Sequence, residues 1–132
     1  MAGKFLVTRL LNKDANSIQQ LIDDETAILA KMSSPFTLQD AYIFIRLYNT
    51  LGIWVDDVLV GALEIKPSGE TAYVIGKEYR RKGYCTRAIR AVNGNIFKKL
   101  LRVNRLWCLI HTDNEISIRI AEKCGLEIVY VK

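Results

Sequence analysis

Three strand-like runs joined by two short turns occupy the middle of the chain, and they limit its fold more than any other feature. The runs are GIWVDD, VLVGALEIK and ETAYVIG, with turns at Asp56-Asp57 and at residues 67–69. Apolar and β-branched residues bounded by turn residues are typical of strands, and turns this short join antiparallel neighbours. We therefore expect three adjacent antiparallel strands here.

A strand and two helices are expected before these runs. Alternation over residues 4–11 predicts the strand, and apolar spacing over residues 14–25 predicts a helix with Asp14 as its N-cap. Thr37 is expected to begin the second helix, because Asp40 lies three residues later and favours the positive end of a helix.

Two helices alternate with two strands after these runs. A helix is predicted over residues 83–101, although the glycine of its NGN segment weakens it. A short buried strand is expected over residues 105–111, and the last strand over residues 126–131. Between them a helix begins at the N-cap Asn114 and ends at Gly125. The order βααβββαβαβ indicates an α/β (α+β) fold, with a mixed, mostly antiparallel sheet flanked by helices.

Length and composition favour one folded domain spanning residues 1–132. Half of the residues are hydrophobic and a quarter are charged, and 132 residues are too few for two ordinary domains. No apolar run approaches the roughly 18–20 residues of a membrane span, and the N-terminus does not resemble a secretory signal. We therefore expect a cytoplasmic protein without a membrane partner.

The cysteines and the single histidine do not form a metal motif. Cys85, Cys108 and Cys124 include no C-x-x-C pair, and His111 stands alone, so reduced thiols in the cytoplasm are expected. Cys85 follows three cations near a predicted helix start, which predicts a lowered pKa for its thiol.

Positive charge is concentrated in the second part of the chain. Residues 1–76 hold 6 Lys/Arg and 9 Asp/Glu, a balance of −3, whereas residues 77–132 hold 13 and 5, a balance of +8. Between Lys77 and Arg105 there are ten basic residues and one acid, Glu78. Such a stretch favours an anionic partner, either a nucleic acid or a phosphate-bearing small molecule.

The stretch YRRKGYCT places Arg80, Arg81 and Lys82 directly before Gly83, where a strand gives way to a helix. The first N–H groups of a helix have no intrahelical partner and lie at its positive end, and a glycine allows a close approach of the backbone to a ligand. Neither G-x-G-x-x-G nor G-K-[ST] is present. The residues alone leave two alternatives, a phosphate site and a solvated basic turn.

Two segments resemble the signatures of one enzyme family. YVIGKEYRRKGYCTRAI is similar to the acetyl-CoA-binding motif of the GNAT superfamily of N-acetyltransferases, whose pattern Gln/Arg-x-x-Gly-x-Gly/Ala is matched by Arg80, Gly83 and Cys85. HTDNEISIRIAEKCGLEI is similar to the second signature, and its wording is nearest to the ribosomal-protein N-terminal and spermidine acetyltransferases. The matching positions there are Asn114, Ser117, Gly125 and Leu126.

The resemblance implies a site for acetyl-CoA. Its pantetheine arm would contact the backbone of Tyr73, Val74 and Ile75, and Asn114 would contact the cofactor where the fourth and fifth strands splay apart. The exposed N–H groups of that splay would polarise the thioester carbonyl. The pyrophosphate would be held by Arg81, Lys82, Gly83, Tyr84, Cys85 and Thr86.

The resemblance also implies direct acetyl transfer to an amine, which is a protein N-terminus, a polyamine or another small amine. Two usual helpers of this reaction are missing. Ala121 stands where many members carry a general-acid Tyr, and Leu109 stands where some N-terminal acetyltransferases carry a basic Glu. Glu70 is the first candidate base and Glu64 the next, while Ser117 is the candidate donor to the departing sulfur. The alternatives are a solvated strand end for Glu70 and a small packed residue for Ser117. Cys85 is not interpreted as a nucleophile.

The acidic first part of the chain is a candidate for the acceptor side. Asp23, Asp24 and Glu25 would attract a cationic acceptor, or they are simply a solvated helix end. Family members usually continue into a hairpin and a seventh strand, whereas this chain stops at Lys132. We therefore expect an exposed sheet edge that the second chain of a homodimer covers.

Two other classes of function stay open at this point. A non-catalytic acyl-CoA-binding or regulatory module fits the missing helpers and the shortened C-terminus. A nucleic-acid-binding domain fits the basic residues 77–105, but Tyr79, Tyr84 and Phe97 are sparse and do not interleave with the charges, so nucleic acid is the least favoured partner.

Overall fold

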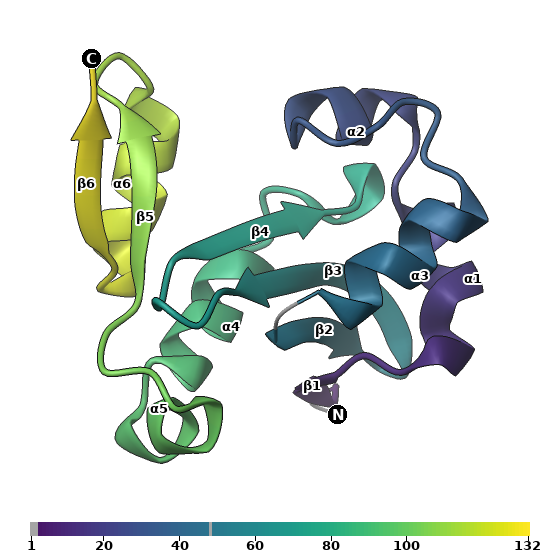
Figure 1. Ribbon diagram of the computed structural model, residues 1–132, viewed down its shortest axis with the longest axis horizontal. Coiled ribbons are helices and arrows are strands. Elements are labelled where there is room, and N and C mark those ends of the chain that lie inside the picture. Colours follow the sequence, from purple (N-terminus) through teal and green to yellow (C-terminus); the bar gives the residue numbers. More distant parts are fainter. Residues whose placement is uncertain (1–2, 48) are drawn as a thin grey trace.

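The computed structural model describes residues 3–47 and 49–132, which form a four-stranded sheet and a two-stranded sheet with helices packed against them (Figure 1). Among these residues, none of the helices has the length and apolar character needed to cross a bilayer. The strands are β1 (Phe5–Arg9), β2 (Asn49–Val55), β3 (Val58–Ile65), β4 (Thr71–Ile75), β5 (Trp107–His111) and β6 (Glu127–Val131). The helices are α1 (Ala15–Leu21), α2 (Asp24–Leu29), α3 (Leu38–Arg46), α4 (Tyr84–Val92), α5 (Asn95–Leu101) and α6 (Glu115–Cys124), with short 3-10 turns at Asn12–Asp14 and Lys77–Tyr79.

The predicted antiparallel strands are confirmed, and β1 extends them in the order β1-β2-β3-β4. Asp56 and Asp57 form the two-residue turn between β2 and β3, with φ of 50° and 67°. Short polar residues tolerate this left-handed conformation, which matches the twist of a hairpin. The second turn closes where the Gly69 N–H donates to the Lys66 carbonyl at 2.8 Å.

The sheet opens between β4 and β5. Glu70 and Trp107 form one isolated parallel bridge, and the Trp107 N–H donates to the Gly69 carbonyl at 3.1 Å. Beyond this point β5 pairs only with β6, in parallel, within the described residues. The β5–β6 pair therefore diverges from β4, as Figure 1 shows, while α6 packs against α4. The splay implied by the resemblance is present.

Alternate residues of the strands divide the core between two faces of the sheet. Ala62 and Val74 pack with Ile18 and Phe44 on the side of α1 and α3. The neighbouring strand residues, such as Leu63, belong to a second cluster on the side of α4 and α6. Because side chains alternate along a strand, each residue of β3 and β4 faces one of two different environments.

Two predicted helices are each divided in two. The helix over residues 14–25 ends at Leu21, and α2 begins after Asp23, whose side chain accepts the Thr26 N–H at 2.8 Å. This new N-cap competes with continuation of the first helix. The helix over residues 83–101 breaks after Val92, at the glycine that weakens it. The side chains of Ile96 and Phe97, and thus the aromatic contribution expected of Phe97, lie outside the described residues.

The predicted caps are confirmed at α3 and α6. Thr37 and Asp40 exchange hydrogen bonds with each other's backbone N–H groups at 3.1 and 2.9 Å, and Gly125 ends α6 with φ of 75°. Asp14 does precede α1, but its carboxylate accepts the Leu11 N–H at 2.8 Å and does not cap the helix. The prediction of a buried strand over residues 105–111 is wrong for one of its faces, because Leu109 is 51% exposed. Helix α6 covers only the face with Cys108 and Ile110.

Candidate active site

The N-terminus of α4 is shaped for an anion. Gly83 has a φ of 77° and precedes the first helical residue, and no side chain among the described residues caps this helix. The first-turn N–H groups of Tyr84, Cys85 and Thr86 therefore lie at the positive helix end without a capping oxygen. A β-carbon added at Gly83 would meet nothing within 4 Å, so the loop faces open space. These groups fit the pyrophosphate of a nucleotide.

The three cations before Gly83 do not act alike. Arg81 and Lys82 are exposed, and neither has an ion-pair partner in the described parts of the chain. Arg80 instead turns toward α2, where it donates to the Thr26 hydroxyl at 2.8 Å, and it donates to the Ile75 carbonyl at 3.2 Å. Arg80 is therefore engaged within the protein, whereas Arg81 and Lys82 remain exposed beside the start of α4.

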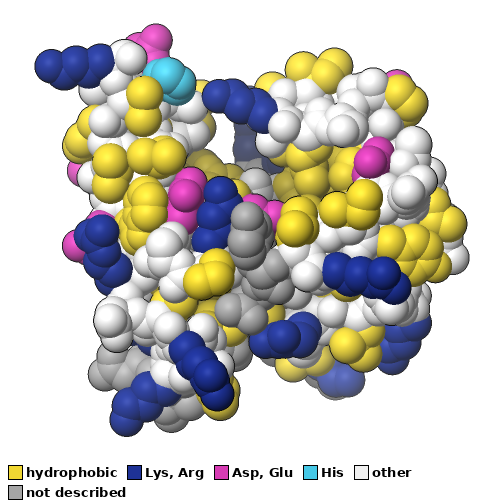
Figure 2. Space-filling view, viewed as in Figure 1, with side chains coloured by type: hydrophobic (Ala, Val, Ile, Leu, Met, Phe, Trp, Pro, Cys, Tyr) yellow, Lys and Arg dark blue, Asp and Glu magenta, His cyan; other side chains and the backbone are white. Residues whose placement is uncertain are grey.

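Strand β4 presents its free edge to the opening. Tyr73, Val74 and Ile75 pair with β3 on one side, and past the Glu70–Trp107 bridge no described strand pairs with them on the other. Figure 2 shows the opening as a hollow between the two parts of the molecule. Unpaired backbone groups on such an edge bind an extended amide-containing arm. The Gly76–Val60 and Lys66–Glu70 bonds place Val74 in a hydrogen-bonded pair with Ala62, so its backbone groups face β3. The Ile75 carbonyl already accepts from Arg80, which leaves the Tyr73 groups and the Ile75 N–H on the free edge.

Asn114 follows β5 on the opposite side of the opening. Its side-chain oxygen accepts the Ser117 N–H at 3.2 Å, and its own N–H donates to the His111 carbonyl at 3.0 Å. The side chain is exposed, and its amide N–H₂ group is left for a ligand. His111 is exposed at the end of β5.

A pocket of about 340 Å³ lies on the α3 side of β3 and β4. Its lining reaches Ala72, Tyr73 and Val74, so it borders the same strand as the opening. Asp40 and Glu64 contribute carboxylates and Lys31 contributes a cation. Much of the remaining lining is apolar and comes from Phe36, Ile43, Phe44, Leu47 and Ala62.

Glu64 has the properties of a base in this pocket. Partial burial raises the pKa of its carboxyl, the nearby Glu70 charge raises it further, and Lys66 acts in the opposite direction. Glu70 precedes β4 at the closed end of the splay, with a carboxylate oxygen 3.6 Å from the Lys66 Nζ, and it is not part of the pocket lining. The geometry thus favours Glu64 over Glu70. One sequence signal for this was available, because Glu64 is the single charge in the apolar run VLVGALEI.

Tyr73 and Ser117 meet across the opening from β4 and α6. Burial raises the pKa of the Tyr73 hydroxyl to about 12, and an interaction with the Ser117 side chain acts in the opposite direction. Ala121, one turn beyond Ser117 on α6, is buried in the same cluster.

One expectation about charge is wrong, and the acidic residues of α2 have structural partners. Burial raises the pKa of the Cys85 thiol, whereas the sequence predicted a lowered pKa, because the side chain points into the core and away from the cations. Asp23 and Glu25 hold α2 in place: Asp23 caps it, and Glu25 lies 2.9 Å from the Lys77 Nζ.

Comparisons with known proteins agree with this geometry. The family model of the acetyltransferase (GNAT) domain matches residues 5–127. No curated protein sequence matches the chain.

Several solved structures share the fold. A GNAT-family acetyltransferase from Bacillus anthracis has a TM-score of 0.74 and 20% identity, covering 95% of this chain and 81% of that one. RimL, a ribosomal alpha-N-protein acetyltransferase in complex with coenzyme A, has a TM-score of 0.74 and 11% identity, covering 91% and 78%. A spermidine N-acetyltransferase from Vibrio cholerae, in complex with coenzyme A and spermine, has a TM-score of 0.68 and 16% identity, covering 92% and 79%.

Proposed function

Because the chain belongs to the GNAT family of acetyltransferases, we propose that it transfers the acetyl group of acetyl-CoA directly to a primary amine. The observation that carries this proposal is the position of β4. One edge of the strand faces the opening that leads to the uncapped start of α4, and one of its faces borders a pocket with a half-buried carboxylate. An acyl donor and an acceptor would thus meet at one strand.

The donor is held by backbone groups in this proposal. The N–H groups of the first turn of α4 bind the pyrophosphate, and Arg81 and Lys82 add positive charge beside it. The free edge of β4 and the Asn114 amide bind the pantetheine arm. Acetyl-CoA supplies the activated thioester, and the unpaired N–H groups of β4 polarise its carbonyl.

The acceptor enters the pocket beside α3. Glu64 accepts the proton that the amine loses, directly or through one water, and Glu70 helps by raising the pKa of Glu64. A volume of about 340 Å³ with two carboxylates and an apolar lining suits a small primary amine or the first residues of a protein N-terminus. RimL and the Vibrio cholerae spermidine N-acetyltransferase act on acceptors of these two kinds.

A second candidate is a module that binds acyl-CoA without catalysis. The observation that favours it is the absence of an acidic hydroxyl at Ala121 and of a carboxylate at Leu109. A nucleic-acid-binding domain is the third candidate. It is less favoured because Arg80, one cation of the basic stretch, bonds to Thr26 within the protein.

A thiol-release assay separates these candidates. We expect coenzyme A to appear when acetyl-CoA is incubated with the protein and one or more amines of a panel containing polyamines, aromatic amines and short peptides with free N-termini. Calorimetric binding of acetyl-CoA without thiol release for any amine supports the non-catalytic module. Binding of neither acetyl-CoA nor coenzyme A overturns both proposals.

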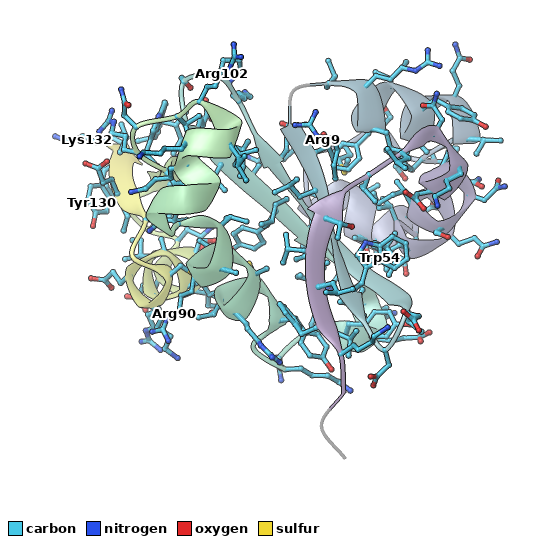
Figure 3. All side chains as sticks on the ribbon, turned by 90° about the horizontal axis from the view of Figure 1, so that it is seen from below. Arg9, Trp54, Arg90, Arg102, Tyr130 and Lys132 are labelled. Carbon is cyan, nitrogen blue, oxygen red and sulfur yellow. The ribbon has the colours of Figure 1, made fainter. Side chains whose placement is uncertain are left out.

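The proposal includes a cytoplasmic homodimer. Support for the dimer comes from β6, which has β5 as its one partner strand within the described residues. Tyr130 also projects from the outer side of β6 (Figure 3), where it is 54% exposed.

A further inference from the structure

Tyr73 occupies the boundary between the two halves of the proposed site. Its Cα pairs with Leu63 of β3, and its side chain packs against the core cluster on the α4 and α6 side of the sheet. The backbone of the same residue lies on the free edge of β4, and the residue also lines the acceptor pocket. A thioester held along β4 would therefore lie next to this side chain.

The Tyr73 side chain packs against the cluster that includes Ala121 and Cys124 of α6, and the Ser117 side chain of the same helix interacts with its hydroxyl and lowers its pKa. The other titratable groups that face it are the thiols of Cys85, Cys108 and Cys124, and each is buried in the same cluster. Hydroxyl groups donate stronger hydrogen bonds than thiols. Among these titratable groups, Tyr73 is thus the strongest hydrogen-bond donor to a negative charge that forms between β4 and α6.

We propose that the Tyr73 hydroxyl donates a hydrogen bond to the coenzyme A sulfur as it leaves, and that Ser117 positions this hydroxyl. The inference rests on the proposed acetyl transfer. It assigns to a strand residue the donor role that the sequence suggested for Ser117, and it explains how the site works with alanine at position 121.

The step balances without a proton from Tyr73. The amine nitrogen forms a bond to the acetyl carbon, the carbon–sulfur bond breaks, and its electron pair remains on the sulfur. The amine proton goes to Glu64, and coenzyme A leaves as a thiolate that takes a proton from solvent. With a pKa of about 12, against about 8.5 for an ordinary thiol, Tyr73 keeps its proton and stabilises the thiolate through the hydrogen bond alone.

Binding of coenzyme A and of desulfo-coenzyme A, compared by calorimetry at pH 9.5, tests this contact independently of turnover. At that pH the free thiol is ionised and Tyr73 is still protonated. We expect the wild type to bind coenzyme A about 10- to 100-fold more tightly than the desulfo analogue. Tyr73→Phe should reduce this ratio to near one and lower kcat by about 10- to 100-fold, with the KM for the amine unchanged.

Ser117→Ala is the second variant, and it retains the Tyr73 side chain but removes the group that positions its hydroxyl. It should partly reduce the ratio of the affinities for coenzyme A and desulfo-coenzyme A. If Tyr73→Phe fails to fold, as judged by its thermal transition, the ratio of Ser117→Ala decides. If the wild type is active and the folded variants have the same affinity ratio as the wild type, the role of Tyr73 is overturned. A wild type that shows the ratio but releases no thiol with any amine overturns the acetyl transfer and leaves the contact with sulfur standing.

Discussion

Arg80 and Thr26, which are 54 positions apart in the sequence, are joined by a hydrogen bond of 2.8 Å from the guanidinium Nη2 to the hydroxyl Oγ1. Thr26 lies in α2 and is 1% exposed, and Arg80 lies directly before the candidate pyrophosphate loop. Helix α2 continues into residues 30–33, which line the acceptor pocket. The bond therefore connects the loop expected to hold the donor with one wall of the site expected to hold the acceptor.

Arg80→Ala should destabilise the protein by about 1–3 kcal/mol, because the buried Thr26 hydroxyl and the Ile75 carbonyl both lose a donor. We also expect a higher KM for the amine, since α2 loses its attachment to β4. Denaturant unfolding and steady-state kinetics measure these effects.

The matched control is Arg81→Ala, which removes an exposed cation with no described ion pair. It should leave the free energy of unfolding unchanged within about 0.5 kcal/mol. Its affinity for coenzyme A should fall and depend less on salt. Equal stability of the two variants would contradict the structural role of Arg80.

Gly83→Ala should cost about 1–2 kcal/mol of stability, because its φ of 77° is unfavourable for any residue with a β-carbon. Gly125→Ala is its control, since Gly125 has a φ of 75° at the far end of α6. Both variants should be destabilised by similar amounts in thermal melts, and only Gly83→Ala should bind coenzyme A more weakly. A similar loss of coenzyme A binding in the control would argue against the loop as the pyrophosphate site.

Glu64→Gln should lower kcat/KM at neutral pH by about 100-fold or more, because a general base contributes 10²–10⁴-fold. Burial raises the pKa of Glu64 above the ordinary carboxyl value, so the ratio of wild-type to variant activity should grow as pH rises through that raised pKa. Tyr73, with a pKa of about 12, adds no descending limb below about pH 11. Glu70→Gln should lose less activity, and a larger loss than in Glu64→Gln would identify Glu70 as the base.

The raised pKa of Glu64 also predicts that Glu64→Gln, which loses activity, gains stability. A carboxyl whose folded-state pKa exceeds its unfolded-state pKa destabilises the fold above the folded-state value, and this cost disappears below the unfolded-state value. Glu64→Gln should therefore melt at a higher temperature than the wild type at pH 8. The difference should vanish near pH 4. A melting temperature below the wild type at pH 8 would show that the carboxylate is stabilised by a partner.

Local signals were sufficient to predict most of the fold. The Asp56-Asp57 hairpin, the Thr37–Asp40 capping box and the Gly125 helix end each depend on residues within a few positions of one another. The residues proposed for the pyrophosphate loop likewise come from one continuous stretch.

Long-range contacts account for what the sequence did not show. The direction of Arg80 is set by Thr26, which belongs to a helix far away in the chain. The raised pKa of Cys85 follows from packing against other elements, and this burial outweighs the cations beside it in the sequence. Glu64 lines the acceptor pocket because α3 packs over β3 and β4, an arrangement that the local sequence does not show.

The outer edge of β6 is the remaining surface with a testable partner. Leu109 and Val129 are paired across β5 and β6, and they are 51% and 40% exposed on the same face. A strand edge that lacks a partner and has apolar neighbours is a template for another strand, and a second copy of this chain can pair with it in a two-fold arrangement.

We expect a homodimer at micromolar concentration in sedimentation velocity. Val129→Lys should shift it to a monomer, because charge on an edge strand opposes pairing. Leu6→Lys is the control, since Leu6 is 46% exposed on β1 at the opposite edge of the other sheet, and this variant should remain a dimer. A wild type that sediments as a monomer at every micromolar concentration refutes the proposed dimer. A dimer that Leu6→Lys dissociates and Val129→Lys does not places the interface on β1 instead of β6.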